Sequence, residues 1–331
     1  TQMMATGEVM SIGNSFEAAM MKAVSSIELG MDTLTHKPFE ELTDDEIVAH
    51  LHVQDAERVF CVYEALKRGI DHETIWKITK IDWWFLDKMQ HLADLEKGLA
   101  KCNGVLSLEQ YQTAKKYGFQ DKTIKRLAQV DVLPVENYRA GFKMVDTCAA
   151  EFSANTPYFY STYDGDNEAA EFIAAREAEA AANGQPKKKK VLVFGSGPIR
   201  IGQGIEFDYC SVHCVWTLKN HGCEAILVNN NPETVSTDFD TGDRLYFDPL
   251  NPESVDNIIA TEKPDACVVQ FGGQTAIKLA KHMDEIGLPI LGTPADAIDE
   301  AEDRERFDEL LERCKIPRAP GRTVFNLDEA L

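Results

Sequence analysis

A short apolar run followed by a glycine-rich loop constrains the fold of this chain most. The residues Val191–Phe194 are all apolar, as expected of a central parallel strand that is buried on both faces. The loop Gly195–Gly204 follows, and then a helix from about Glu206 to His221 that ends at Gly222. Further strands are expected at 225–228, 244–247, 266–270 and 289–291, with helices at 274–286 and 303–314. This alternation predicts right-handed crossovers and a doubly wound parallel sheet.

The preceding residues, from about 35 to 138, have a helical pattern instead. Thr43 and Ser107 each begin a capping-box sequence, and Asp55, Asp71 and Asp82 are expected at the starts of further helices. Apolar residues recur at helical spacing between these signals, as in Val59, Val62 and Leu66 and in Leu86, Met89, Leu92 and Leu95. The first part is therefore predicted to be a compact all-α domain, and the whole chain a mixed fold with an all-α part before an α/β part.

These changes of pattern also predict the domain boundaries. Residues 1–33 have the pattern of a strand followed by a helix that stops at Gly30. The helical domain is expected over 34–160, a surface helix and linker over 161–188, and the α/β domain over 189–310. The remaining residues, 311–331, are expected to begin a further unit, because both ends of the chain have the appearance of cuts in a longer polypeptide.

The charge of the chain excludes one large class of partner. The formal net charge is −21, so the phosphates of duplex nucleic acid would be repelled. One basic run, Lys187–Lys190, stands directly before the first predicted strand of the α/β domain. It is interpreted as the solvated end of a linker, with a phosphate-binding patch as the alternative.

The composition predicts a cytoplasmic location. No run approaches the ~20 apolar residues that a bilayer requires, and the start lacks the pattern of a signal peptide. The 8 cysteines have no paired spacing, which is typical of a reducing compartment.

The glycine-rich loop does not fit the common nucleotide-binding fingerprints. In the dinucleotide motif GxGxxG the third glycine would fall at Arg200, and Asn229, Asn230 and Asn231 stand where an acidic ribose ligand would end the second strand. No Gly-Lys-Ser/Thr follows the loop, so it is not a Walker loop either. A free-standing dehydrogenase with bound NAD is therefore only an alternative.

Three other groups of residues are candidates for a site or a contact surface. Cys210, His213 and Cys214 could face one way on a helix, but no second pair completes a zinc site, and an apolar stripe with Phe207 and Leu218 favours core packing. Gly272 and Gly273 follow the end of a predicted strand. They could form a loop that approaches a ligand, or a tight turn in which Gln274 caps the next helix. Trp83 and Trp84 are expected in the helical core or on an assembly surface.

Four segments, in order, carry a more specific resemblance. They are GSGPIRIGQGIEFDYCSVH, VNNNPETVSTDFDTGDRLYFDPL, VVQFGGQTAIKLA and GTPADAIDEAEDRERF. Together they resemble the subdomain that precedes the ATP-grasp fold in carbamoyl phosphate synthetase large chains, in the form of its second, carbamate-phosphorylating half. Upstream, TGEVMSIG and the segment from VDTCAAEF to YSTYD resemble the end of the first ATP-grasp body and the exit of the oligomerisation domain.

The resemblance implies roles for four residues. Gly204, Glu206 and Glu233 match positions that line the family's interior tunnel for carbamate, and Arg304 matches an arginine that reaches the phosphates of ATP. Each has a simpler alternative: turn geometry for Gly204, a favourable helix dipole for Glu206, a solvated loop position for Glu233, and a surface salt bridge for Arg304. No catalytic residue and no metal ligand is expected within this chain.

The resemblance also implies the function of a parent enzyme. Such a ligase makes carbamoyl phosphate from bicarbonate, glutamine-derived ammonia and two MgATP, with a glutaminase small subunit as partner and with self-association. This chain lacks a complete ATP-grasp body, so we expect it to be inactive alone and to hold no cofactor tightly. An isolated interaction module is the other alternative. Whether the parent serves pyrimidine or arginine synthesis is left open.

Overall fold

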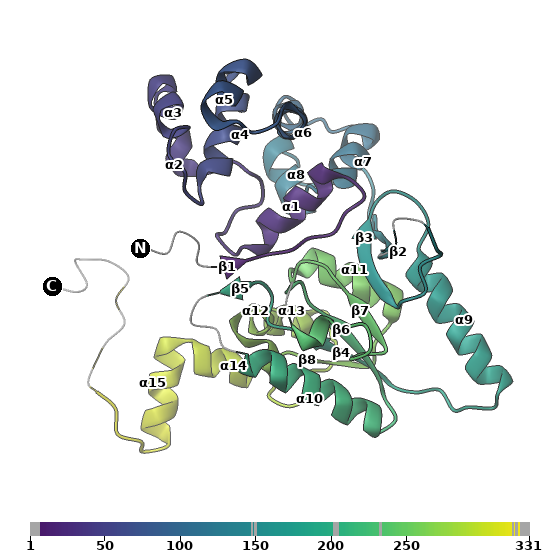
Figure 1. Ribbon diagram of the computed structural model, residues 1–331. Helices are drawn as coiled ribbons and strands as arrows, with labels where there is room; N and C mark the ends of the chain where they lie inside the picture. Colours follow the sequence, from purple (N-terminus) through teal and green to yellow (C-terminus); the bar gives the residue numbers. More distant parts are fainter. Residues whose placement is uncertain are drawn as a thin grey trace.

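The structure is a computed structural model that describes residues 7–146, 148, 151–200, 205–231, 234–319, 321 and 324. It combines a group of short helices with a six-stranded mixed sheet that has helices against it (Figure 1). This combination agrees with the mixed fold class that the sequence predicts.

The helical part is built from short helices that are joined by short connections. Their bounds are α1 (Phe16–Ser26), α2 (Lys37–Glu40), α3 (Asp44–His50), α4 (Arg58–Arg68), α5 (His72–Thr79), α6 (Trp83–Ala100), α7 (Leu108–Lys116) and α8 (Asp121–Ala128). Both predicted capping boxes are present, at Thr43 and at Ser107. Asp71 and Asp82 cap α5 and α6 as predicted, whereas Asp55 binds the amide of Glu57 in the turn before α4.

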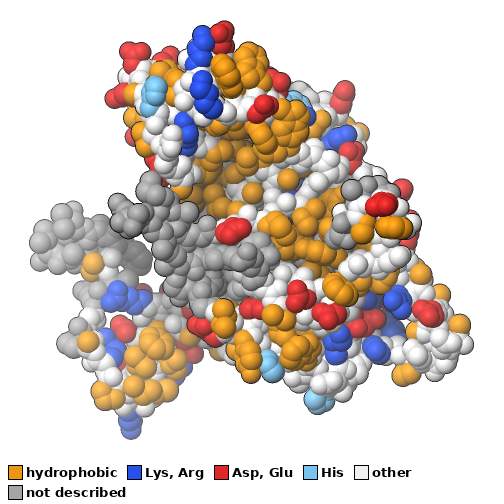
Figure 2. Space-filling view, in the orientation of Figure 1, with side chains coloured by type: hydrophobic (Ala, Val, Ile, Leu, Met, Phe, Trp, Pro, Cys, Tyr) orange, Lys and Arg blue, Asp and Glu red, His pale blue; other side chains and the backbone are white. Residues whose placement is uncertain are grey.

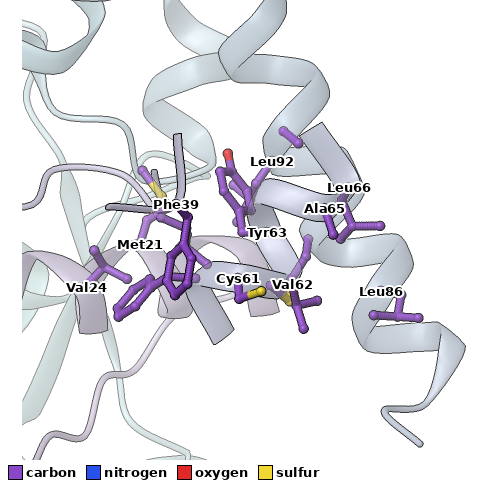
Figure 3. Close-up of a cluster of buried hydrophobic side chains, with 14 of the residues drawn as sticks. Met21, Val24, Phe39, Cys61, Val62, Tyr63, Ala65, Leu66, Leu86 and Leu92 are labelled. Atoms are coloured by element: carbon purple, nitrogen blue, oxygen red, sulfur yellow. The ribbon is translucent and has the colours of Figure 1, made fainter. Parts of the chain in front are cut away.

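One apolar core holds these helices together. Phe39, Val62 and Leu92 are among the side chains that interdigitate there (Figure 3). Met21 and Val24 of α1 belong to the same core, so α1 packs with the helical part although it precedes it in the sequence. The predicted stripe on α6 is confirmed, because Leu86, Met89 and Leu92 are buried.

The sheet has the strand order β2-β3-β7-β6-β4-β8. Its strands are β2 (Gly141–Met144), β3 (Tyr158–Thr162), β4 (Lys190–Phe194), β6 (Glu224–Val228), β7 (Arg244–Tyr246) and β8 (Ala266–Val268). The pairs from β3 to β8 are parallel, and β2 joins β3 in the antiparallel sense. A separate pair is formed by β1 (Gly7–Glu8) and β5 (Ile199–Arg200).

Alternate residues of the central strands serve two different cores. Val191 and Val193 face one core, which is closed by Val215 of α10 (Glu206–Asn220). Leu192 and Phe194 face the other core. That core is closed by α9 (Glu168–Ala182), α11 (Pro252–Glu262), α12 (Gly273–Ile277) and α13 (Ala280–Glu285). Helices therefore cover both faces, as predicted for a doubly wound sheet.

The sheet begins earlier in the sequence than predicted. Strand β2 and most of β3 lie in the range that was assigned to the helical domain, whereas α9 confirms the helix predicted within 161–188 but packs on the sheet. Phe142 and Phe159 are fully buried in the sheet core, and Ala169 of α9 packs on the same core. Burial of these side chains is the physical reason why the segment joins the sheet.

The last part of the α/β region differs from prediction in detail. The predicted helix at 274–286 is divided into α12 and α13, and the predicted strand at 289–291 is a single bridge between Ile290 and Cys267. Two further helices follow, α14 (Ala295–Glu302) and α15 (Arg304–Arg313). Among the described residues no helix is both long and apolar enough to cross a membrane.

Candidate functional site at the carboxyl edge of the sheet

The carboxyl ends of β4, β6 and β7 lie side by side, because these strands are neighbours and parallel. This is the edge at which doubly wound sheets bind ligands. The glycine-rich loop leaves β4 here, and the run Asn229–Asn231 leaves β6. The candidate site is therefore built from these two loops and the start of α10.

Asn229 braces the first part of the glycine-rich loop. Its side chain is fully buried, its Oδ1 accepts from the backbone N–H of Gly197, and its Nδ2 donates to Ser236. Gly195 must lack a side chain, because an added Cβ would collide with the Asn229 amide. Gly197 has a φ of +72°, a left-handed conformation that glycine adopts without strain. The asparagine thus links the two loops.

Asn230 adds a buried acceptor to the same edge. Its residue is only 2% exposed, and its Oδ1 has no hydrogen-bond partner within the described ranges. A buried, unpaired amide oxygen is costly, at about 1–3 kcal/mol, so such a group points to a polar neighbour or ligand. In the sequence, the three asparagines indicated the absence of a ribose ligand and belonged to one of the family-like segments, but no site role was predicted for them. The polar run at a strand end was the signal that could have identified them.

Glu206 is the first residue of α10 and is exposed. Two residues later, Asp208 accepts from the backbone amides of Val235 and Ser236, so the start of α10 is tied to the segment that follows the asparagines. Glu206 thus lies where the two loops of the site meet the helix. Its position fits the tunnel role that the resemblance implies and also the simpler alternative of a carboxylate near a helix N-terminus.

The other predicted site residues are less well placed by the structure. Gly204 and Glu233 lie outside the described residues. Arg304 is the first residue of α15 and is exposed, without a hydrogen bond or ion pair to any residue in the described part. The neighbouring Arg306, rather than Arg304, pairs with Asp296 and Asp299. Arg304 therefore lacks the surface salt bridge that was its simpler interpretation, and the structure does not join it to Glu206.

The glycine pair after β8 serves the backbone. Gly272 lies against the carbonyl groups of Phe194 and Gly195, where any side chain would collide. It is also the N-cap residue of α12, which has no side-chain cap. The suggested capping role of Gln274 is therefore wrong, and the tight-turn interpretation of this pair is supported.

The residues that were considered for a zinc site, Cys210, His213 and Cys214, do not share one environment. Cys214 packs against the sheet core with Leu218, whereas His213 is exposed. Burial raises the pKa of the Cys214 thiol to about 11. In the described ranges no group of three or more His, Cys, Asp or Glu side chains is arranged to hold a metal ion.

The basic run before β4 has two different environments. Lys190 is buried and pairs with Glu177 at 2.8 Å, whereas Lys187 and Lys188 are exposed. All three line an open pocket of about 570 Å³ together with Arg176, Glu179, Glu224 and Arg244. Both acidic and basic side chains line this pocket, which lies at the amino ends of the strands, away from the site described above.

Two lysines, one partly and one fully buried, join the helical part to the sheet. Lys22 of α1 donates to Asp248, which follows β7, and to the carbonyl oxygens of Ile12 and Ser161. Asp248 lies at the carboxyl edge beside the asparagines. Since α1 packs in the helical core, this pair fixes the helical part against the edge that carries the candidate site.

The second lysine of the junction is Lys115 of α7. Its side chain is fully buried and pairs with Glu253 of α11 and with Asp121. Burial by itself would lower the pKa of Lys115, but Tyr163, Glu253 and Asp121 act in the opposite direction and outweigh it, so the pKa is raised. The lysine is therefore charged at neutral pH, and it lines a small junction cavity of about 50 Å³.

The N-terminal segment also reaches the glycine-rich loop. Gly7 and Glu8 form β1, which pairs in the antiparallel sense with Arg200 and Ile199 of that loop. The two-stranded pair of β1 and β5 lies between α1 and the sheet (Figure 1). Residues near both ends of the helical part thus contact the α/β part close to the candidate site.

Comparison with protein families yields two matches. Residues 8–143 match the oligomerisation domain of the carbamoyl-phosphate synthetase large chain, and residues 187–300 match the carbamoyl phosphate synthase preATP-grasp domain. The two matched ranges correspond to the helical part and to most of the sheet with its covering helices.

Curated relatives match the chain from end to end. The carbamoyl phosphate synthase large chain of Agathobacter rectalis is 52% identical to this chain over 336 residues, and that of Lachnoclostridium phytofermentans is 52% identical over 338 residues. The large chain of Clostridium acetobutylicum is 47% identical over 336 residues. Each alignment covers 100% of this chain and 30% of the relative. The chain therefore belongs to the carbamoyl phosphate synthase large-chain family, and it spans about 30% of the length of the curated relatives that it matches.

Proposed function

We propose that this chain acts as a segment of an ATP-dependent ligase that makes carbamoyl phosphate from bicarbonate and glutamine-derived ammonia. The observation that carries the proposal is the 52% identity, over the whole chain, with a protein named carbamoyl phosphate synthase large chain. In this proposal the segment contributes structure and one wall of a passage, and the phosphoryl-transfer chemistry needs further parts of a large chain.

The proposed arrangement has the helical oligomerisation unit first and the preATP-grasp unit second. The sequence suggested that residues 1–33 end a first ATP-grasp body, but the oligomerisation match begins at residue 8 and α1 packs in the helical core, so we assign α1 to the oligomerisation unit. Only the residues before about position 8 would end a first ATP-grasp body, and residues after about 310 would begin a second one. We place the boundary between the two units near residue 140, earlier than the sequence alone suggested. Two observations favour this choice: the oligomerisation match stops at residue 143, and β2 (Gly141–Met144) is hydrogen-bonded into the sheet.

The passage for carbamate would run along the carboxyl edge of the sheet. Support comes from the exposed carboxylate of Glu206 and from the unpaired amide oxygen of Asn230 in the loop after β6. A glycine at position 204 would leave the bore open, and Glu233 would add a second carboxylate. Such groups can hold water and guide a small polar intermediate without gripping it.

Arg304 would contribute to a nucleotide site. Its guanidinium is exposed and has no acidic partner among the described residues, so it is available to a polyphosphate. When bound, MgATP supplies the phosphoryl group, and Arg304 would hold its phosphates from this side. Because no cluster of metal-ligating side chains occurs in the described ranges, the carboxylates that hold magnesium would come from other parts of a large chain.

Self-association would use the helical part. Trp76, Trp83 and Trp84 are each more than a third exposed, which is unusual for tryptophan and typical of contact surfaces. This feature also favours the second candidate function, an isolated interaction module, which differs from the first in requiring no ligase. A glutaminase small subunit is the further partner that we infer, and the cytoplasm is the inferred location.

The first experiment tests the ligase assignment with a chimeric large chain. The 336-residue segment of the Agathobacter rectalis large chain that aligns with this chain is replaced by this chain. We expect carbamoyl phosphate synthesis from bicarbonate, ammonia and ATP by the chimera. The isolated chain should give neither this product nor bicarbonate-dependent ATP hydrolysis, and either activity in the isolated chain would refute its dependence on further parts.

A matched pair of variants tests the passage in the same chimera. Glu206→Ala should lower the yield of carbamoyl phosphate per ATP hydrolysed, since intermediate would be lost between two steps. Glu305→Ala removes an exposed carboxylate from another helix and should leave this yield unchanged.

The second candidate function, an isolated interaction module, is tested by light scattering of the isolated chain over a concentration series. A strict monomer at high concentration would count against it.

A further inference from the structure

The outer face of α10 carries a row of exposed aromatic side chains. Tyr209 is 62% exposed and Trp216 is 45% exposed, and His213 lies between them with ring-centre distances of 4.2 Å to Tyr209 and 5.2 Å to Trp216. Positions 209, 213 and 216 follow the spacing i, i+4, i+7, so they form one stripe along the helix. Hydrophobic side chains gather over α10 in the space-filling view (Figure 2).

The segment 234–241 runs beside this helix and extends the apolar surface. Asp208 near the start of α10 holds the amides of Val235 and Ser236, and Lys219 near its end donates to the carbonyl oxygens of Asp240 and Thr241. The segment is thus fixed at both ends of the helix. Between these anchors, Val235 is 51% exposed and Phe239 is 67% exposed.

Together with Ile205, which is 87% exposed at the N-cap of α10, these side chains define the α10 aromatic face. The face consists of Ile205, Tyr209, His213, Trp216, Val235 and Phe239. The opposite side of α10 anchors the helix to the sheet, with Val212 and Val215 buried. The aromatic face is therefore not needed to hold α10 in place, and an apolar patch of this kind marks a contact surface.

Acidic side chains at the edge of the face restrict its partner. Glu206, Asp238 and Asp240 are exposed there, and the whole chain has a net charge of −21. Nucleic acid is disfavoured by this charge, although aromatic rings can stack on bases. A second copy of the same face would bring its carboxylates against these, so self-pairing is disfavoured as well. The face fits a partner with an apolar centre and a basic edge.

The size of the relatives identifies a source for such a partner. The alignments with the large chains of Agathobacter rectalis and Lachnoclostridium phytofermentans cover 100% of this chain but only 30% of each relative, so a large chain has much more polypeptide that could cover this face. We propose that the α10 aromatic face is the docking surface for another domain of a large chain, with Tyr209 and Trp216 as its anchors. This inference rests on the proposed function, since it places the chain within a large chain.

The test compares the exposure of the two anchors in the isolated chain and in the chimeric large chain. Hydroxyl-radical labelling with mass spectrometry is applied to both proteins, with free phenylalanine as the dose reporter. We expect labelling of Tyr209 and Trp216 to fall at least about fivefold in the chimera, because anchors at the centre of a contact lose their solvent. The labelling of the isolated chain should be the same at low and high protein concentration.

A double variant gives a second measurement. Tyr209→Ser with Trp216→Ser should leave the urea midpoint of the isolated chain unchanged and lower that of the chimera. The matched control is Val105→Ser with Val132→Ser, because these side chains are 79% and 76% exposed and lie far from α10 in the sequence. The control should change neither urea midpoint. This pair separates loss of docking from a general loss of apolar surface.

The outcomes distinguish the docking surface from the proposed function. Anchors that stay fully labelled in the chimera, or that become protected in the isolated chain as its concentration rises, overturn the proposal. The second result would identify another copy of the chain as the occupant. A chimera that is inactive but has protected anchors would refute the ligase assignment alone, and an active chimera with unprotected anchors would refute the docking surface alone.

Discussion

The ammonium nitrogen of Lys22 lies 2.7 Å from Oδ1 of Asp248, across 226 positions of the sequence. Asp248 is fully buried and also accepts from the amide and the hydroxyl group of Ser161. This pair connects α1, and through it the helical core, with the carboxyl edge of β7. It is therefore a structural link between the region that matches an oligomerisation domain and the edge that carries the candidate site.

Removal of the lysine charge should destabilise the chain strongly. Lys22→Met leaves the buried Asp248 carboxylate without its cation, which typically costs about 3–5 kcal/mol. Lys278→Met is the control, because its pair with Glu28 is exposed at the lysine and should contribute less than about 1 kcal/mol. Urea unfolding measures both free energies. If Lys22→Met costs no more than Lys278→Met, the pair has no role in joining the two parts.

The Asn229 side chain should be necessary for an ordered glycine-rich loop. Asn229→Ala leaves the buried N–H of Gly197 and the hydroxyl group of Ser236 without this partner, at about 1–3 kcal/mol for each group. Hydrogen exchange at the Gly197 amide should accelerate accordingly. Asn220→Ala, on the exposed end of α10, should change neither the stability nor this exchange rate.

A double variant checks the close approach at the same place. Gly195→Ala should destabilise the chain, because its methyl group would collide with the Asn229 amide. In the double variant Gly195→Ala/Asn229→Ala that amide is absent. Gly195→Ala should therefore lower the stability less when Asn229→Ala is already present than it does in the unaltered chain. Costs that simply add would show that the two residues are not in contact.

The capping box at Thr43 gives a smaller and more local effect. Thr43→Ala removes the side-chain acceptor for the Glu46 amide and should cost about 1 kcal/mol, whereas Thr43→Ser should cost less. The backbone and side-chain hydrogen bonds from Thr43 lower the pKa of Glu46. That contribution is present at neutral pH and disappears as the pH falls through the lowered pKa. The difference between the two variants, measured by urea unfolding, should therefore shrink in acid.

Local signals in the sequence predicted much of the fold. The capping boxes at Thr43 and Ser107 depend on residues three positions apart, so they can be identified without knowledge of the tertiary structure. The apolar run Val191–Phe194 also defines its own strand. In contrast, β3 joins the sheet by pairing with β7, where the register partner of Phe159 is Tyr246, 87 positions later, and β2 joins the sheet through β3. No local pattern specifies such a distant partner.

The candidate site was less predictable for the same reason. The role of Asn229 depends on its contact with Gly197, which the crossing from β4 to β6 creates. Glu206 could be placed at the start of a helix from the sequence, but its neighbours on the sheet edge could not. Arg304 was expected to form a surface salt bridge if it had no function, and Arg306 forms that pair instead. Helix periodicity cannot decide between two arginines that are two positions apart.

Buried thiols predict how the stability of the chain depends on pH. Burial, with a smaller contribution from Asp55, raises the pKa of Cys61 to about 11, and burial raises that of Cys267 to about 12. In the unfolded chain both thiols ionise near the ordinary value of about 8.5. Above that pH the unfolded state has released protons that the folded state still binds, so the free energy of unfolding should fall as the pH rises.

The loss should reach about 1 kcal/mol for each thiol at pH ~9.5, which is below the ordinary pKa of tyrosine at about 10. Urea unfolding at neutral pH and at that pH measures it. Cys61→Ala/Cys267→Ala lowers the stability at both values because it leaves cavities, but the difference between the two values should become smaller. Cys148→Ala/Cys314→Ala removes exposed thiols and should keep the wild-type difference. An equal difference in all three proteins would show that the buried thiols ionise as freely in the folded chain as in the unfolded one.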